Sequence, residues 1–273
     1  MVTQADDGYI LARTEAEYAR LRHQARLWED ATRRVLAGAG LAPGMRCLDA
    51  GCGPGEVMRL MGRVVGPEGQ VTGCDIDARL GERTLADLRR DEGARFDFVA
   101  ADIVAGDAVR GAPFDLVFAR HLLLHMVDPV GAVRALARLV RPGGTLVLMD
   151  YDMSRMACRP EEPSMTRAFA IIAGCYTRSG KRADCGLCLA EYLRDAGLPV
   201  PEAGLTDTFY VAIATRGAMV RAVLASLVGA AEALGVASAR EIADLQSRIS
   251  DLEAANRHFA LGPLMVGVWT TVG

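Results

Sequence analysis

Long apolar runs are missing from this 273-residue sequence. No stretch reaches about 18 consecutive apolar residues, the length that spans a bilayer as a helix. The first residues, "MVTQADDGYI", also lack the basic segment and apolar core of a secretory signal. We therefore expect a cytoplasmic protein with no membrane partner.

Dense basic clusters are absent as well. The formal net charge is −3, and no run of Lys and Arg is interleaved with aromatic residues. Lysine occurs only at Lys181, which leaves one candidate for Schiff-base chemistry. A nucleic-acid partner is not expected, because nothing here would attract a phosphate backbone.

Cysteine pairs that would form a disulfide framework are also lacking. The seven cysteines are an odd, unevenly spaced set, so reduced thiols are expected. Cys185 and Cys188 form one C-x-x-C, but a structural zinc site needs two further ligands, and no second pair has suitable spacing. His121 and His125 would share a face of a helix, yet "HLLLH" lacks the glutamate of H-E-x-x-H. No metal is expected.

Short β-rich runs do recur along the chain, separated by helical patterns. The runs are "MRCLDA", "QVTGCDI", "FDFVAADI", "FDLVFAR" and "TLVLMD". This alternation predicts an α/β fold with a parallel sheet covered on both faces. A ligand would lie outside the carboxyl ends of the strands.

The remaining segments predict one domain with additions. Residues 1–40 are expected to form an N-terminal helical lid, residues 41–150 the core, and residues 151–273 the C-terminal part of the same domain. That last part should contain helical insertions at about 152–200 and 216–259. Its two late strands should lie in "LTDTFYVAIAT" and "LGPLMVGVWTTVG".

The stretch "CLDAGCGPGEV" places Asp49 just before three glycines. In a nicotinamide-binding fold such glycines admit a pyrophosphate, which a neighbouring carboxylate would repel. The sixth position of a G-x-G-x-x-G motif starting at Gly51 is moreover Glu56. A positively charged ligand would instead be attracted by this carboxylate. S-adenosylmethionine (SAM) carries two such groups, an ammonium and a sulfonium. Alternatively, Asp49 caps the following helix.

Two further acids end the next two strands. Asp75, in "GCDID", is placed to accept two ribose hydroxyls, and Asp102, in "AADI", can accept from an adenine amino group. Taken singly, either acid could be a solvated turn residue. Three acids at successive strand ends fit one ligand laid across the sheet.

In order and spacing, "LDAGCGPG", "GCDID", "AADI", "FDLVFARHLLLHM" and "LVRPGGTLVLMD" resemble the motifs of class I SAM-dependent methyltransferases. The resemblance implies a Rossmann-like, doubly wound seven-stranded sheet in the order 3-2-1-4-5-7-6, with strand seven antiparallel. It also implies SAM as cofactor and S-adenosylhomocysteine (SAH) as product. The cofactor-binding residues that it implies are Asp49, Ala50, Gly51, Gly53, Gly55, Asp75, Ile76, Asp102, Ile103, Arg120, His121, Tyr18 and Gln24.

Some of these assignments have structural alternatives. Arg120 could pair with a nearby acid instead of a ligand. Tyr18 and Gln24 could be surface residues of the first helix, judged by periodicity alone. His121 could be a structural histidine.

The acceptor is expected to be a small, partly apolar or aromatic molecule. The chain has "ARHLLLHM" where amino methyltransferases acting on nucleic-acid bases carry N/D-P-P-aromatic. An apolar pocket could be walled by Met153, Met156, Met165, Phe169, Tyr176, Met219 and Met265.

The chain is similar in general appearance to methyltransferases of bacterial secondary metabolism, including those that methylate an indole ring carbon. O- or N-methylating relatives look much the same, and a noncatalytic or rearrangement protein on this fold is a further alternative. A monomer or homodimer is expected.

The catalytic candidates are His125, Arg120 and Tyr18. A histidine near the methyl group could remove a proton from the acceptor, because its ordinary pKa lies near neutral pH. The sulfonium already activates the methyl group, so no covalent intermediate is needed.

Overall fold

The computed structural model describes residues 15–90, 93–106 and 108–273. Its main element is a seven-stranded sheet in the order β3-β2-β1-β4-β5-β10-β7. The first five strands are parallel, whereas β10 runs antiparallel to both β5 and β7. This confirms the predicted order 3-2-1-4-5-7-6. The strands are β1 (Arg46–Ala50), β2 (Gln70–Asp75), β3 (Arg95–Ala100), β4 (Phe114–Arg120), β5 (Val140–Asp152), β7 (Gly204–Asp207) and β10 (Leu264–Thr271).

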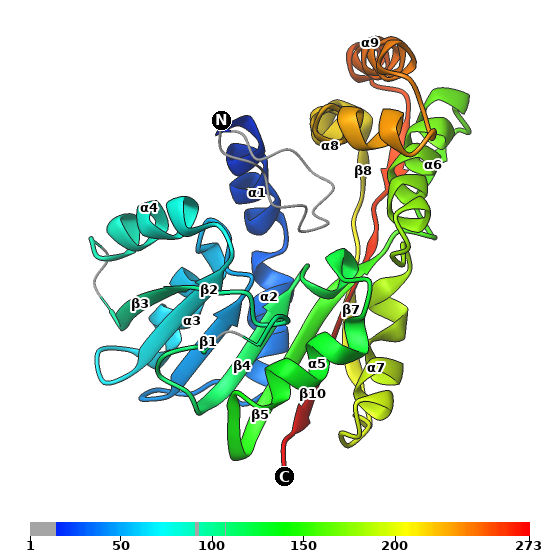
Figure 1. Cartoon of the computed structure of the whole chain (residues 1–273). Helices are drawn as coiled ribbons and strands as arrows, with labels where there is room; N and C mark the ends of the chain where they lie inside the picture. The colour runs from blue at the N-terminus through cyan, green and yellow to red at the C-terminus, as the bar shows by residue number, and fades with distance from the viewer. Residues whose placement is uncertain (1–14, 91–92, 107) are drawn as a thin grey trace.

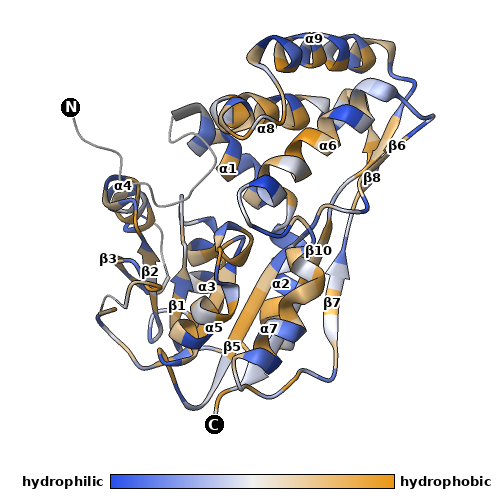
Figure 2. Ribbon diagram, turned by 45° about the vertical axis from the view of Figure 1, so that its right-hand side comes forward, coloured by the Kyte–Doolittle hydropathy of each residue, from blue (hydrophilic) through white to orange (hydrophobic). Residues whose placement is uncertain are grey.

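Helices cover both faces of this sheet. One face packs against α2 (Glu29–Gly38), α3 (Glu56–Val65) and α4 (Ala78–Leu88), and the other against α5 (Pro129–Ala137) and α7 (Leu189–Asp195). The interior strand β5 is hydrophobic over most of its visible length (Figure 2), as expected for a strand buried on both faces. Two of these helices begin at predictable caps, because Asp77 accepts from Leu80 N and Asp128 from Gly131 N.

A second layer lies beyond the carboxyl ends of the parallel strands. It contains α1 (Glu15–Leu27), α6 (Pro163–Arg178), α8 (Ile213–Ala233) and α9 (Ala239–Ala255), which gather on one side of the sheet in Figure 1. A three-stranded sheet, β6-β9-β8, joins them; its strands are β6 (Ala157–Arg159), β8 (Tyr210–Ala212) and β9 (Phe259–Leu261). Two 3₁₀ turns, η1 (Leu123–His125) and η2 (Cys185–Cys188), complete the elements.

The two late strands differ in detail from the sequence prediction. The segment "LTDTFYVAIAT" is divided: β7 joins the main sheet, while β8 joins the small sheet, and α8 already begins at Ile213. The alternation of apolar and polar residues is the same whether two neighbouring strands join one sheet or two. The sequence therefore could not predict this division.

Helix α8 is, by length and apolar composition, the one helix among the described residues that could cross a membrane. In the fold it packs against α9 and α6 and carries two arginines, Arg216 and Arg221. Its Gly217 and Val220 line a cavity. These contacts account for only part of its apolar composition, because 22% of its apolar window is buried within the described chain.

Candidate cofactor and acceptor site

A cavity of about 350 Å³ lies at the carboxyl ends of the parallel strands, between the sheet and the second layer. Of the predicted site residues, those that line it are Tyr18, Gln24, Asp49, Gly51, Gly53, Asp75, Ile76, Asp102, Ile103, Arg120, His121 and His125. Ala50 and Gly55 lie outside its lining. Ala50 is fully buried in β1, and a Cβ on Gly55 would meet Thr84 Cγ2 at 2.2 Å, so this glycine allows α3 and α4 to approach.

The glycine loop after β1 leaves open space at one position. Gly53 has φ +47°, and a Cβ there would meet nothing within 4 Å. Its N–H donates to Asp75 Oδ2 at 2.9 Å, which ties the loop to the end of β2. A ligand can therefore approach this backbone closely, as the resemblance implies.

Asp49 is a buried carboxylate that still has bonding capacity. It is 2% exposed, and its Oδ2 has no hydrogen-bond partner in the described part of the chain. Burial raises its pKa to about 7, against the lowering effects of Arg120 and of the Met58 N–H in the first turn of α3. Capping of α3 therefore explains part of the hydrogen bonding of Asp49. Its unpartnered oxygen, Oδ2, remains suited to accept from a ligand's ammonium group.

Arg120 provides the opposite charge in the same cavity. It is partly buried and donates from Nη1 to Thr32 Oγ1 at 2.8 Å, and desolvation lowers the pKa of its guanidinium. Within residues 15–90, 93–106 and 108–273 it has no acid within ion-pair distance, but its charge interacts at longer range with that of Asp49. Asp49 and Arg120 together complement a zwitterion, the form of the amino-acid end of SAM.

The end of β2 connects the sheet to helix α1. Asp75 Oδ1 accepts from Asp77 N at 3.0 Å, and Asp77 Oδ2 accepts from the Tyr18 hydroxyl at 2.6 Å. Sequence reasoning missed Asp77, although its spacing from the helical run after it is that of an N-cap. At the end of β3, Asp102 Oδ1 accepts from Val104 N and from Ala105 N, so its turn role coexists with its place in the cavity.

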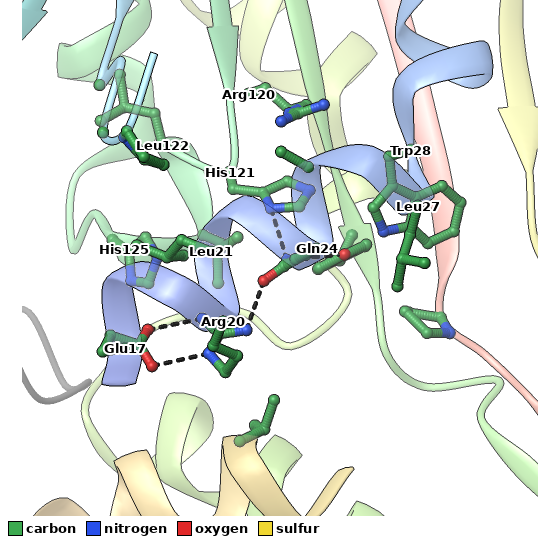
Figure 3. A pocket seen from close by; sticks show the side chains of 18 of the residues that line it. Glu17, Arg20, Leu21, Gln24, Leu27, Trp28, Arg120, His121, Leu122 and His125 are labelled. Carbon is green, nitrogen blue, oxygen red and sulfur yellow. Dashed lines mark hydrogen bonds and ion pairs between the residues drawn. The ribbon is translucent and has the colours of Figure 1, made fainter. Parts of the chain in front are cut away.

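A chain of polar side chains on α1 orients His121 (Figure 3). Glu17 accepts two bonds from Arg20, and Arg20 Nη1 donates to Gln24 Oε1 at 2.5 Å. Because that bond fixes the amide orientation, Gln24 Nε2 must donate to His121 Nδ1, at 3.0 Å, and to the Tyr151 hydroxyl, at 2.8 Å. The ring proton of His121 is therefore on Nε2, which has no partner among the described residues. Tyr18 and Gln24 both face the cavity, so the surface-residue alternative is wrong.

The two histidines do not share a helix face. His121 has φ +55°, a left-handed conformation that is rare for a non-glycine residue and is often found at functional sites, and only Leu123–His125 form a 3₁₀ turn. Burial lowers the pKa of His125 to about 3, assisted by the charges of Lys181 and Arg20. The expectation that His125 titrates near neutral pH is therefore wrong. Its role as a base stays a prediction.

The outer part of the cavity is mainly apolar. Six of the seven predicted wall residues line it, namely Met153, Met156, Met165, Phe169, Tyr176 and Met219. Met265 instead packs in the core between the sheet and α2–α3. Sequence reasoning missed an aromatic group in which Trp28 contacts Tyr151 and Phe209, with ring centroids 5.6 and 5.5 Å away. No local pattern brings these three distant residues together.

This sheet order, glycine loop and row of strand-end acids are those of the SAM-dependent methyltransferase fold. In a comparison with known protein families, the methyltransferase domain family matches residues 18–202 of this chain. The chain belongs to that family.

Individual relatives are more distant. The chain is 29% identical to a ubiquinone/menaquinone biosynthesis C-methyltransferase of Hahella chejuensis over 149 residues, 54% of this chain and 55% of the relative. It is 36% identical to a ubiquinone biosynthesis O-methyltransferase of Xanthomonas campestris over 116 residues, 42% of this chain and 46% of the relative. The chain thus spans about half the length of the curated relatives it matches.

Solved structures share the fold over nearly the whole chain. A SAM-dependent methyltransferase from Aquifex aeolicus superposes with a TM-score of 0.56 at 14% identity, covering 96% of this chain and 100% of the other. The cyclopropane synthase MmaA2 from Mycobacterium tuberculosis gives 0.53 at 15%, covering 97% and 95%. The [4+2]-cyclase SpnF gives 0.51 at 22%, covering 90% and 82%.

Proposed function

We propose that the protein transfers a methyl group from SAM to a small, partly apolar or aromatic acceptor. The observation that carries this proposal is one continuous cavity with the opposed charges of Asp49 and Arg120 at the sheet and an apolar wall beyond them. The first part suits the cofactor's amino-acid end, and the second suits an apolar acceptor.

We assign the described residues to SAM along its length. The orphan Oδ2 of Asp49 would take the ammonium group, and Arg120 the carboxylate. Asp75 would hold the ribose, with Ile76, Asp102 and Ile103 around the adenine. Gly51 and Gly53 would admit the methionyl chain.

Bound SAM supplies an activated methyl group, so the chain's own tasks are positioning, water exclusion and proton handling. Helix α1 covers the cavity through Tyr18 and Gln24. His121 offers an N–H donor from Nε2 and cannot accept a proton at Nδ1 while Gln24 donates there. We assign proton removal to His125, directly or through one water, with Arg120 and Tyr18 as positioning groups.

The finer proposal is C-methylation of an indole ring in bacterial secondary metabolism. Ring methylation is compatible with the aromatic group around Trp28 and with the methionine-rich wall. O- or N-methylation remains the alternative, and the curated relatives are named for both C- and O-methylation. The cyclase among the structural neighbours motivates a second alternative, a rearrangement protein that binds the cofactor without using it.

The test is incubation with methyl-deuterated SAM and a panel of indole, phenol and amine metabolites, read by mass spectrometry. Transfer of one deuterated methyl group to an indole carbon supports the finer proposal, and transfer to oxygen or nitrogen supports the alternative. SAH binding without any methylated product would favour the noncatalytic class.

A further inference from the structure

Arg216, in the first turn of α8, lines the outer part of the cavity. Its guanidinium carbon lies 4.7 Å from the centroid of the Phe209 ring. Its Nη1 is shielded from solvent and has no hydrogen-bond partner among residues 15–90, 93–106 and 108–273. A buried guanidinium donor without an acceptor is costly, so its position in a cavity wall points to a ligand.

The other two arginines that line the cavity each have an acid that offsets their charge, Glu17 in direct contact with Arg20 and Asp49 at longer range from Arg120. Arg20 is bound by both oxygens of Glu17, with N···O distances of 2.7 and 2.6 Å. Arg120 faces Asp49, and the proposed cofactor adds one charge of each sign to that pair. Arg216 makes no ion pair with an acid in the described part of the chain, and its guanidinium lies over the face of the Phe209 ring.

The surroundings of Arg216 limit what its partner can be. Gly217, Val220 and Phe209 line the same wall, and Met219 and Val223 extend it. A dianionic phosphate needs several donors, whereas this site offers one guanidinium, whose planar fork matches a carboxylate. The rest of the ligand must be apolar, because the wall around it is.

We propose that Arg216 binds the carboxylate of the acceptor, which is a monoanionic organic acid with an apolar or aromatic body. The proposal rests on the proposed function, because it assigns the cofactor's charges to Asp49 and Arg120. It makes Arg216 a residue that determines acceptor specificity.

Two pairs of probes separate charge from shape. With SAH saturating, we compare 8-anilinonaphthalene-1-sulfonate, an apolar monoanion, with its neutral analogue N-phenyl-1-naphthylamine by dye fluorescence. Indole-3-acetate and indole-3-acetamide then compete for the bound neutral dye. Arg216→Gln should weaken binding of the sulfonate and of indole-3-acetate about ten- to hundredfold, the range for a lost charged hydrogen bond, and leave the neutral partners within twofold.

Matched variants control for folding and net charge. Arg216→Lys keeps the charge but not the fork, so it should retain part of the affinity for the anions. Arg248→Gln removes one exposed positive charge from α9, outside the cavity lining, and should change nothing. Thermal unfolding verifies that each variant is folded.

Three results would overturn the inference: unchanged anion affinity in folded Arg216→Gln, equal loss for anionic and neutral probes, or an equal loss of SAH affinity. The last would place Arg216 at the cofactor's own carboxylate. Failure of wild-type protein to bind SAH in calorimetry would instead refute the proposed function, independently of Arg216.

Discussion

The hydroxyl of Tyr18 donates to Oδ2 of Asp77 at 2.6 Å, although the two residues are 59 positions apart. Asp77 caps α4 with its other oxygen, so this bond fastens α1 to the start of α4. Both residues line the cavity proposed for the cofactor. SAM or SAH bound in this cavity would therefore lie against this contact.

Tyr18→Phe should speed SAH release without unfolding the sheet. Losing a partly exposed hydrogen bond costs about 1 kcal/mol, which corresponds to a roughly fivefold faster dissociation in stopped-flow fluorescence. Tyr210→Phe is the matched control, because Tyr210 is exposed on β8 and outside the lining. An unchanged dissociation rate in Tyr18→Phe would show that the contact does not restrain the cofactor.

Asp49→Asn should abolish the pH dependence of SAH affinity that the Asp49 carboxylate causes. The pKa of about 7 means that the wild-type carboxylate becomes protonated as pH falls below 7. Because the ammonium group prefers the ionised form, wild-type SAH affinity should fall by about tenfold per pH unit there. The Asn variant should bind more weakly at pH 8 and show no such dependence, measured by calorimetry. A parallel pH dependence in both proteins would remove Asp49 from the site.

The same substitution should stabilise the folded chain at pH 8. The folded-state pKa of Asp49 is raised above its ordinary value of 3.8, so the folded state binds the extra proton between about pH 4 and 7. Stability is therefore lost as pH rises through this window, by up to about 4 kcal/mol. Urea unfolding should show that Asp49→Asn has a higher free energy of unfolding than the wild type at pH 8, by much of this roughly 4 kcal/mol, and almost the same value at pH 4. A destabilised variant at pH 8 would contradict the burial argument.

Gln24→Glu should reverse the tautomer of His121. A carboxylate can still accept from Arg20 but cannot donate, so Nδ1 of His121 would carry the proton and the imidazolium would be favoured. Long-range ¹H–¹⁵N NMR should find the Nε2–H form in wild type and the Nδ1–H or charged form in the variant. Finding Nδ1–H already in the wild-type protein would refute the assignment.

His125→Gln should lower kcat by about 10²-fold, the lower end of the range for a general base, because a group with a pKa of about 3 is a weak base. At saturating SAM, His125 should add no acidic limb to the wild-type pH profile between pH 6 and 8. Unchanged kcat in a folded variant would make His125 structural and leave Tyr176, whose ring centroid is 5.8 Å away, as the next candidate.

The sequence predicted the sheet and the row of acids because both depend on short patterns. Strands alternate with helices at a regular spacing, and the carboxyl ends of parallel strands meet at one edge, so Asp49, Asp75 and Asp102 had to lie together. The left-handed loop glycines were likewise marked by their residue type.

The acceptor side could not be predicted in this way. After β7 the chain leaves the main sheet, forms β8 in the small sheet and continues into α8, which lines the cavity. Only this path brings Phe209 to Trp28 and Arg216 to Phe209. The pKa of His125 depends on burial, which the residue's own neighbours in sequence do not determine. Contacts between distant segments therefore decide the part of the site that selects the acceptor.

The bond from Gln24 to His121 would couple any movement of α1 to the protonation of His121. While α1 is docked, Nδ1 is occupied by the amide, and burial keeps the pKa of His121 well below its ordinary value. If α1 moved away, as its predicted lid role implies, that nitrogen would meet water and the pKa of His121 would rise toward its ordinary value of about 6.5. Below that pH the open chain would bind a proton that the closed chain does not, so a proton and Gln24 would compete for the same nitrogen. Acidification would therefore favour opening.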